Sequence, residues 1–121
     1  MFIQIEDPSD LPRPPEEVQI RAIDIDPYPD GQRLRVLIEL TPFMESPDLS
    51  VRVLNNQGKE AADLSIVGAH QQSLGLTIHL RGPYSQDPYT IDATVLYEDL
   101  GQVHQVSKTF TIVRESGNDQ A

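Results

Sequence analysis

Residues 89–101 read YTIDATVLYEDLG, and this stretch decides the fold class. Apolar side chains occupy every second position of its first part: Tyr89, Ile91, Ala93, Val95 and Tyr97. Because successive side chains of a strand point to opposite faces, this alternation predicts a strand with one buried face and one face in water. The polar turn at 98–101 then returns the chain into another alternating run, as in an antiparallel sheet.

Six further strand-like runs lie outside this stretch, separated by segments rich in Pro, Gly and Asn. They cover about residues 18–26, 33–41, 49–53, 64–67, 74–80 and 103–113. No segment of ten residues or more repeats apolar side chains at helical spacing. Short strands at this regular spacing predict an all-β fold, an immunoglobulin-like antiparallel β-sandwich of about seven strands.

Two local signals refine this prediction. In the first run the apolar positions change phase at Ala22, which predicts a bulge or a strand that changes sheets. The sequence Asn55-Asn56-Gln57-Gly58 predicts a hairpin turn, because Asn and Gly tolerate positive φ.

The chain divides into three parts by composition. Residues 1–17 form a Pro-rich N-terminal arm, residues 18–113 the sandwich, and residues 114–121 a polar tail that we expect to be disordered. Phe2 to Ile5 could pair as a strand within the chain or with a neighbour. We therefore expect a monomer or a weak homodimer.

Composition excludes several classes of function. The chain has 121 residues, enough for one domain with its own core, and it lacks the cysteines that disulfides or thiolate metal sites require. Nineteen acidic against nine basic residues give a net charge of −10, which disfavours nucleic acid and anionic membranes as partners. Neither a signal peptide nor a membrane-spanning apolar run is recognisable. We expect a cytoplasmic protein if this is the full gene product, and an extracellular domain fragment otherwise.

The last third resembles bacterial immunoglobulin-like and fibronectin type III-like domains. In those families a strand of the form Tyr-x-hydrophobic-x-Ala-x-Val leads through an acidic or Gly turn into the final strand. The positions that carry the pattern are Tyr89, Ile91, Ala93, Val95, Asp99, Gly101, Phe110 and Ile112. Leu40 stands where fibronectin type III domains usually carry Trp. The resemblance implies a sandwich, and it implies that Tyr89 packs inward and bonds a nearby backbone carbonyl through its hydroxyl.

Chemistry at specific residues is sparse. Asp24, Asp26 and Asp30 are weak candidates for a calcium site, because alternate carboxylates at a strand end can converge. The competing interpretation is a strand end followed by a tight turn. His70, His79 and His104 lie on different elements without the spacing of a zinc site, so we expect isolated surface histidines. No nucleophile motif, phosphate loop or cofactor motif is present, and we predict no enzymatic activity and no cofactor.

Two loops carry the residue types that interfaces favour. Phe43 and Met44 follow the second strand, and Arg81 and Tyr84 lie in the loop before residue 89. These four residues are the candidate partner-binding residues. Phe43 and Met44 could instead plug one end of the sandwich.

We therefore predict a non-enzymatic protein-interaction or structural module, whose partner is another protein, bound by end loops or an open sheet edge. The alternative is a ligand-binding β-sandwich, for calcium or carbohydrate, that uses acidic and aromatic loop residues.

Overall fold

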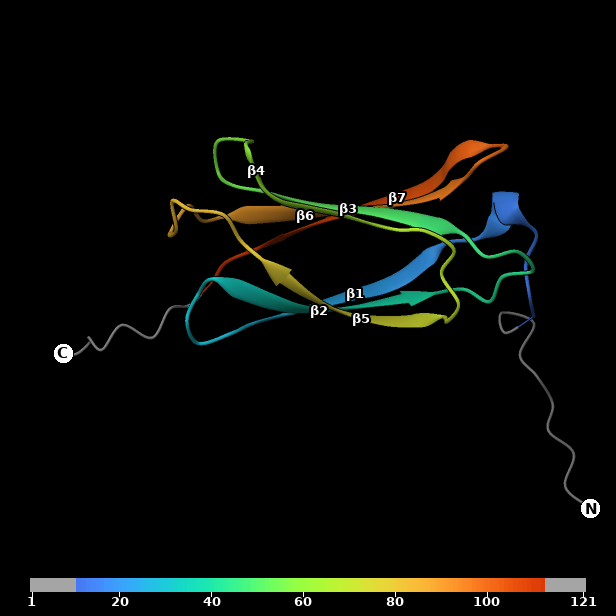
Figure 1. The fold of residues 1–121 in the computed structure, drawn as a ribbon, viewed down its shortest axis with the longest axis horizontal. Coiled ribbons are helices and arrows are strands. Elements are labelled where there is room, and N and C mark those ends of the chain that lie inside the picture. The colour runs from blue at the N-terminus through green and yellow to red at the C-terminus, as the bar shows by residue number, and fades with distance from the viewer. Residues whose placement is uncertain (1–10, 113–121) are drawn as a thin grey trace, which may run out of the picture.

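The computed structural model describes residues 11–112 and contains two antiparallel sheets stacked face to face (Figure 1). The three-stranded sheet has the order β1-β2-β5, with bounds Ile20–Pro27, Arg33–Leu40 and Ser73–His79. The four-stranded sheet has the order β4-β3-β6-β7, with bounds Glu60–Ile66, Asp48–Leu54, Tyr89–Tyr97 and Gly101–Phe110. A 3-10 turn, η2, covers Pro15–Glu17. The predicted all-β sandwich of seven strands is confirmed.

The two sheets bury their facing side chains in one core. On β6 the five alternating residues from Tyr89 to Tyr97 are all buried, as predicted. On β2 the alternation is equally regular, with Leu34, Val36, Ile38 and Leu40 fully buried. The Tyr89 ring stacks on Phe110 with ring centroids 5.8 Å apart. Period-two placement of apolar residues therefore produces the core directly.

Both local signals in the sequence have the predicted result. The register of β1 with β2 shifts between Ile20 and Ala22, and this bulge allows Ile20 and Ile23 both to face the core. Asn55 to Gly58 form the turn between β3 and β4, where Gly58 has a φ of 78° and its N–H donates to the Asn55 carbonyl at 2.9 Å.

The N-terminal part of the described chain lies against the loop between β2 and β3. Arg13 forms a parallel bridge with Phe43, and its carbonyl accepts a hydrogen bond from the Met44 N–H at 2.9 Å. Thr41 is buried, and it exchanges two hydrogen bonds with the backbone of Gln19. The predicted strand at Phe2 to Ile5 and the predicted tail at 114–121 lie outside the described residues.

Side chains of β7 close the gap between the two sheets where the edge strands β1 and β7 meet. The register of β7 with β6 places His104 opposite Val95 and Lys108 opposite Ile91, so both point inward. His104 Nδ1 accepts the Ile20 N–H at 3.0 Å, and Lys108 Nζ donates to the Ile23 carbonyl at 2.8 Å. Two backbone groups on the free edge of β1 are thereby satisfied.

Lys108→Met should lower the free energy of unfolding by about 1 kcal/mol, because the Ile23 carbonyl loses a charge-assisted hydrogen bond. His104→Ala should have a similar effect through the Ile20 N–H. Lys59→Met and His70→Ala, at exposed positions, are matched controls and should change stability by less than about 0.5 kcal/mol. Urea unfolding measures all four; equal effects of the edge variants and their controls would contradict the assigned closing role.

Candidate interaction surface

The predicted partner-binding residues lie at opposite ends of the sandwich. Phe43 and Met44 belong to the loop between β2 and β3, whereas Arg81 and Tyr84 belong to the loop between β5 and β6, at the other end of these strands (Figure 1). Phe43 is half-buried against the core, and Met44 is 66% exposed. The four residues therefore do not form one surface.

Arg81 and Tyr84 both have local structural roles. The Arg81 guanidinium lies 3.7 Å from the Glu60 carboxylate, and its backbone N–H donates to the Ala61 carbonyl at 2.8 Å. The Tyr84 hydroxyl donates to the Leu80 carbonyl at 3.2 Å. This loop thus ties the end of β5 to the start of β4, and a partner-binding role for its residues stays a prediction.

Asp24 and Asp26 lie on the outer face of β1, because their neighbours Ile23 and Ile25 face the core. Asp30 lies in the following turn, where its carboxylate accepts the Gln32 N–H at 2.9 Å and pairs with the Arg33 guanidinium at 3.0 Å. The hydrogen bond from the Gln32 N–H lowers the pKa of Asp30; desolvation opposes this, and the hydrogen bond and charge of the Arg33 guanidinium lower the pKa further. Within residues 11–112, no three His, Asp or Glu side chains gather in a group suited to a metal ion. Calcium at these aspartates stays a prediction.

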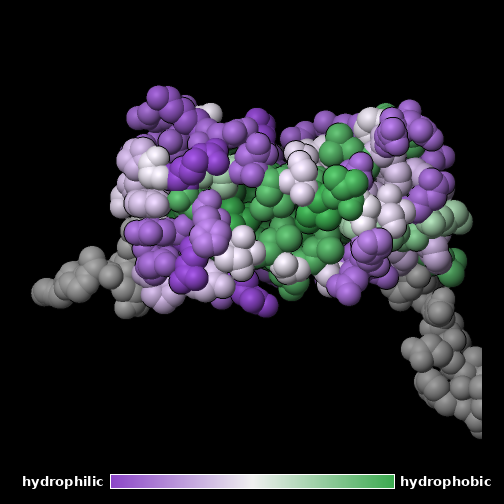
Figure 2. All heavy atoms as spheres, viewed as in Figure 1, coloured by the Kyte–Doolittle hydropathy of each residue, from purple (hydrophilic) through white to green (hydrophobic). Residues whose placement is uncertain are grey.

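Some apolar side chains of β4 and β5 are only partly buried. Leu64 and Ile66 of β4 face inward opposite Val51 and Leu49, and Leu74 and Leu76 of β5 face inward opposite Ile38 and Val36. All four pack on the core yet remain partly exposed; we call them the apolar seam. Figure 2 shows hydrophobic surface over β4 and β5, bordered by hydrophilic side chains.

The seam exists because β4 and β5 are both edge strands, of different sheets, and do not pair with each other. Among the described residues, the backbone hydrogen bond from Arg81 to Ala61 links them at one end, and the loop of residues 67–72 connects them at the other. A shallow hollow of about 340 Å³ lies at the end of β4, and Ile66, Val67 and Leu96 are among its lining residues. Exposed apolar surface rimmed by polar residues is typical of protein interaction sites.

A second hollow, of about 460 Å³, lies at the end of the sandwich that carries the β6–β7 turn. No Lys or Arg is among its lining residues. Five carboxylates line it: Glu16, Glu45, Asp48, Glu98 and Asp99. The buried Tyr97 also borders it, and its hydroxyl donates to the Glu45 carbonyl at 2.7 Å. Burial, and then the negative charge of Glu45, raise the pKa of Tyr97.

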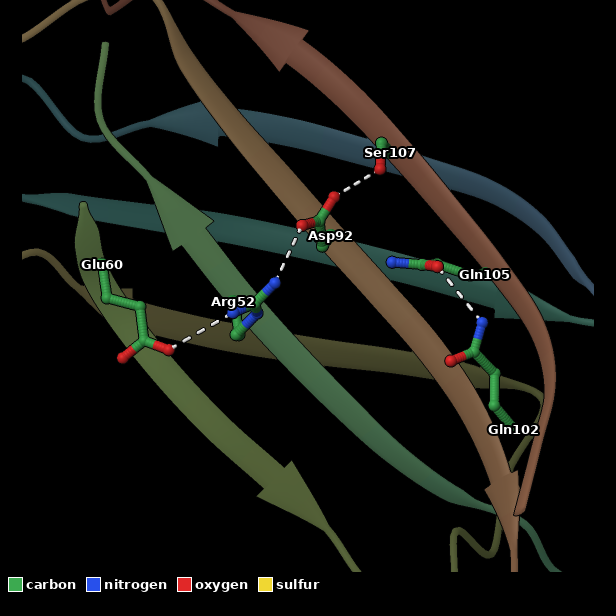
Figure 3. Close-up of polar contacts among 6 residues, drawn as sticks. All are labelled: Arg52, Glu60, Asp92, Gln102, Gln105 and Ser107. Carbon is green, nitrogen blue, oxygen red and sulfur yellow. Dashed lines mark hydrogen bonds and ion pairs between the residues drawn. The ribbon is translucent and has the colours of Figure 1, made fainter. Parts of the chain in front are cut away.

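The outer face of the four-stranded sheet is polar and internally paired (Figure 3). Arg52 lies between two carboxylates, 3.7 Å from Glu60 and 3.4 Å from Asp92, and Ser107 donates to Asp92. Gln102 and Gln105 bond each other at 3.1 Å. Exposed ion pairs of this kind contribute little to stability. Their polar groups already have partners, so the network is not a prepared ligand site.

Neither a protein-family model nor a curated protein sequence matches this chain. Solved structures of β-glucuronidases do match its fold. The enzyme from Ruminococcus gnavus in complex with D-glucuronic acid aligns with a TM-score of 0.52 and 18% identity, over 79% of this chain and 16% of that chain. The Bifidobacterium dentium enzyme complexed with coumarin-3-O-glucuronide aligns with a TM-score of 0.64 and 16% identity, over 78% and 18%. This chain therefore spans less than a fifth of those enzymes, and the likeness establishes a β-sandwich fold. Among residues 11–112, no helix is long and apolar enough to cross a membrane.

Several residues have roles that differ from the sequence-based expectation. His79 and His70 are exposed, as predicted, but His104 is half-buried and holds the edge of β1. Tyr89 packs inward as predicted, and its hydroxyl accepts the Gln86 N–H at 3.2 Å. Tyr97, at the other end of the same strand, donates a hydrogen bond from its hydroxyl to the distant backbone carbonyl of Glu45. Sequence reasoning also missed the apolar seam, because its residues have the spacing of ordinary core positions.

Tyr97→Phe should lower the free energy of unfolding at pH 7 by about 1 kcal/mol, because the Glu45 carbonyl loses its donor. The pKa of Tyr97 is raised in the folded state, so its contribution is complete below the unfolded pKa of about 10 and is lost as the pH rises through the folded pKa. The stability difference between wild type and variant should therefore shrink in alkali. Urea unfolding between about pH 7 and 11 tests this, with Tyr84→Phe as the control. A difference that stays constant with pH would contradict it.

Proposed function

We propose that this chain is a non-enzymatic immunoglobulin-like module that binds another protein through the apolar seam. The seam is the observation that carries the proposal: Leu64, Ile66, Leu74 and Leu76 are core residues that their own fold leaves partly in water. A partner that covers them would remove apolar surface from water, at about 25 cal/mol per Å². Its edge position also supports binding, since edge strands accept partner strands.

Strand order supports a fibronectin type III-like rather than an antibody constant-like arrangement. In constant-type immunoglobulin domains the fourth strand joins the sheet of the first, second and fifth strands. In this chain the fourth strand, β4, pairs with β3 instead, which leaves β5 as an edge. The resemblance noted from Tyr89, Val95 and Gly101 agrees with this assignment. The fold of this chain matches less than a fifth of two much longer enzymes, and this also supports a module that works beside other domains.

The absence of an enzymatic role is part of the proposal. In the part of the chain that the structure describes, Thr41 is the only buried polar residue apart from the core tyrosines, and the backbone of Gln19 satisfies it. The carboxylates that line the 460 Å³ hollow beside Tyr97 are solvent-accessible, so they lack the burial that prepares an acid–base pair.

Site-specific photo-crosslinking tests the seam as a protein-binding surface. A benzophenone amino acid at position 74 should crosslink to a protein in an extract of the source cells, and one at Thr109, on the outer face of β7, should not. The identified protein should then bind purified Leu76→Ser at least tenfold more weakly than wild type. Leu37→Ser is the matched control, because Leu37 is an exposed leucine on the outer face of β2. Equal loss of affinity in both serine variants, or crosslinks from position 109 only, would refute the proposal.

A carbohydrate ligand is the second candidate, because the matched folds belong to enzymes in complex with D-glucuronic acid and with coumarin-3-O-glucuronide. The polar face around Arg52 and Asp92 is the surface such a ligand would use, yet its side chains are already paired. We expect D-glucuronic acid at millimolar concentration to leave the thermal midpoint of unfolding unchanged. A native-state ligand must raise the midpoint, so an increase that Arg52→Ala abolishes would favour the carbohydrate role.

A further inference from the structure

Strand β5 differs from the other six strands in having no Asp, Glu, Lys or Arg. Its sequence is SLGLTIH, from Ser73 to His79, and it lies at the edge of its sheet. Natural edge strands usually carry charges, prolines or bulges that prevent pairing with other chains. The edge of β1 has such protection from its bulge, His104 and Lys108. β5 has none.

The hydrogen bonds at the two ends of β5 show which of its backbone groups are free. The Gln72 carbonyl accepts the Leu40 N–H, and the Leu80 N–H donates to the Gln32 carbonyl, both at 2.8 Å. In an antiparallel ladder such residues alternate, so Leu74, Leu76 and Ile78 also direct their backbone groups toward β2. The N–H and C=O groups of the intervening residues therefore point away from the sheet: Ser73, Gly75, Thr77 and His79.

We propose that β5 is a self-association strand, which pairs antiparallel with β5 of a second copy and joins the two three-stranded sheets into one. This inference rests on the proposed function and names the partner at the seam. The strand is complementary to itself about Leu76: Ser73 faces His79 of the other copy, Gly75 faces Thr77, and Leu74 faces Ile78. The residues with free backbone groups face each other in this register, as an antiparallel pair requires.

Side chains support the same register. Outside the sandwich it juxtaposes only small or uncharged groups, so no like charges meet at the contact. Inside, Leu76 of one copy meets Leu76 of the other, and the two apolar seams adjoin. Each copy carries a net charge of −10, so most other encounters between copies bring acidic surfaces together. The repulsion between two acidic copies opposes a contact through the uncharged strand β5 least.

Sedimentation equilibrium of the full chain measures self-association. The mass should rise from 13.5 kDa toward twice that value over about 5 to 500 µM protein, and more readily at about 0.5 M than at 0.02 M salt, because salt screens the repulsion. Thr77→Lys and Thr77→Pro should each weaken the dimer at least tenfold. Both keep the ladder with β2, since the Thr77 N–H points away from it. Thr109→Lys, an exposed threonine on β7, is the matched control and should dimerise as wild type does.

A cysteine crosslink tests the register, since the chain has no cysteine of its own. At the centre of the proposed pair the Cα atoms of the two Leu76 residues lie about 4.5 Å apart, within the range of a disulfide. Leu76→Cys should therefore form a disulfide-linked dimer faster than Val67→Cys, although Val67 is 83% exposed. Circular dichroism and thermal unfolding of each variant verify the fold.

A wild-type chain that stays monomeric over the whole range, or faster linkage through position 67, would overturn self-pairing. If the seam nevertheless crosslinks to a different protein in the extract, the proposed function stands and its partner is not a second copy. If neither self-pairing nor crosslinks from position 74 occur, both proposals fail.

Discussion

A sandwich of two open sheets has four edge strands, and each edge presents unpaired N–H and C=O groups beside the margin of an apolar core. How these edges are covered governs the rest of this structure. On one side, β1 and β7 meet, and Lys108 and His104 bond the free backbone of β1. On the other side, β4 and β5 do not pair, and within residues 11–112 the backbone hydrogen bond from Arg81 to Ala61 links them at one end. The molecule is therefore closed along one margin and open along the other.

The core between these margins is conventional in its energetics. Aliphatic side chains from both sheets bury one another, and the few polar groups among them bond to backbone: Thr41 to Gln19 and the Tyr97 hydroxyl to the Glu45 carbonyl. Such bonds prevent the cost of an unsatisfied buried group. Leu74 and Leu76 are exceptions, because a fourth strand beside β5 would be needed to bury them fully.

Period-two alternation predicted the seven strands, the buried face of β6 and the bulge near Ala22, and the Asn and Gly residues predicted the turn at Asn55 to Gly58. These features depend on local spacing and backbone preference. Alternation could not reveal that Leu76 lies on an edge strand, because a central strand has the same pattern. It also could not reveal the partners of His104 and Lys108, which lie 84 and 85 residues away in the chain. Likewise, sequence reasoning grouped Phe43 with Tyr84 by residue type, although the topology places them at opposite ends.

The distribution of charge gives the open margin its selectivity. Ordinarily, an uncharged edge strand would expose a protein to indiscriminate pairing and aggregation. In this chain the net charge of −10 lies outside that edge strand, because β5 itself has no Asp, Glu, Lys or Arg. Contacts elsewhere on the surface therefore meet long-range repulsion, whereas a strand that aligns with β5 gains backbone hydrogen bonds and covers Leu74 and Leu76. The acidic surface thus disfavours association at other sites, and the uncharged strand β5 favours association by strand pairing.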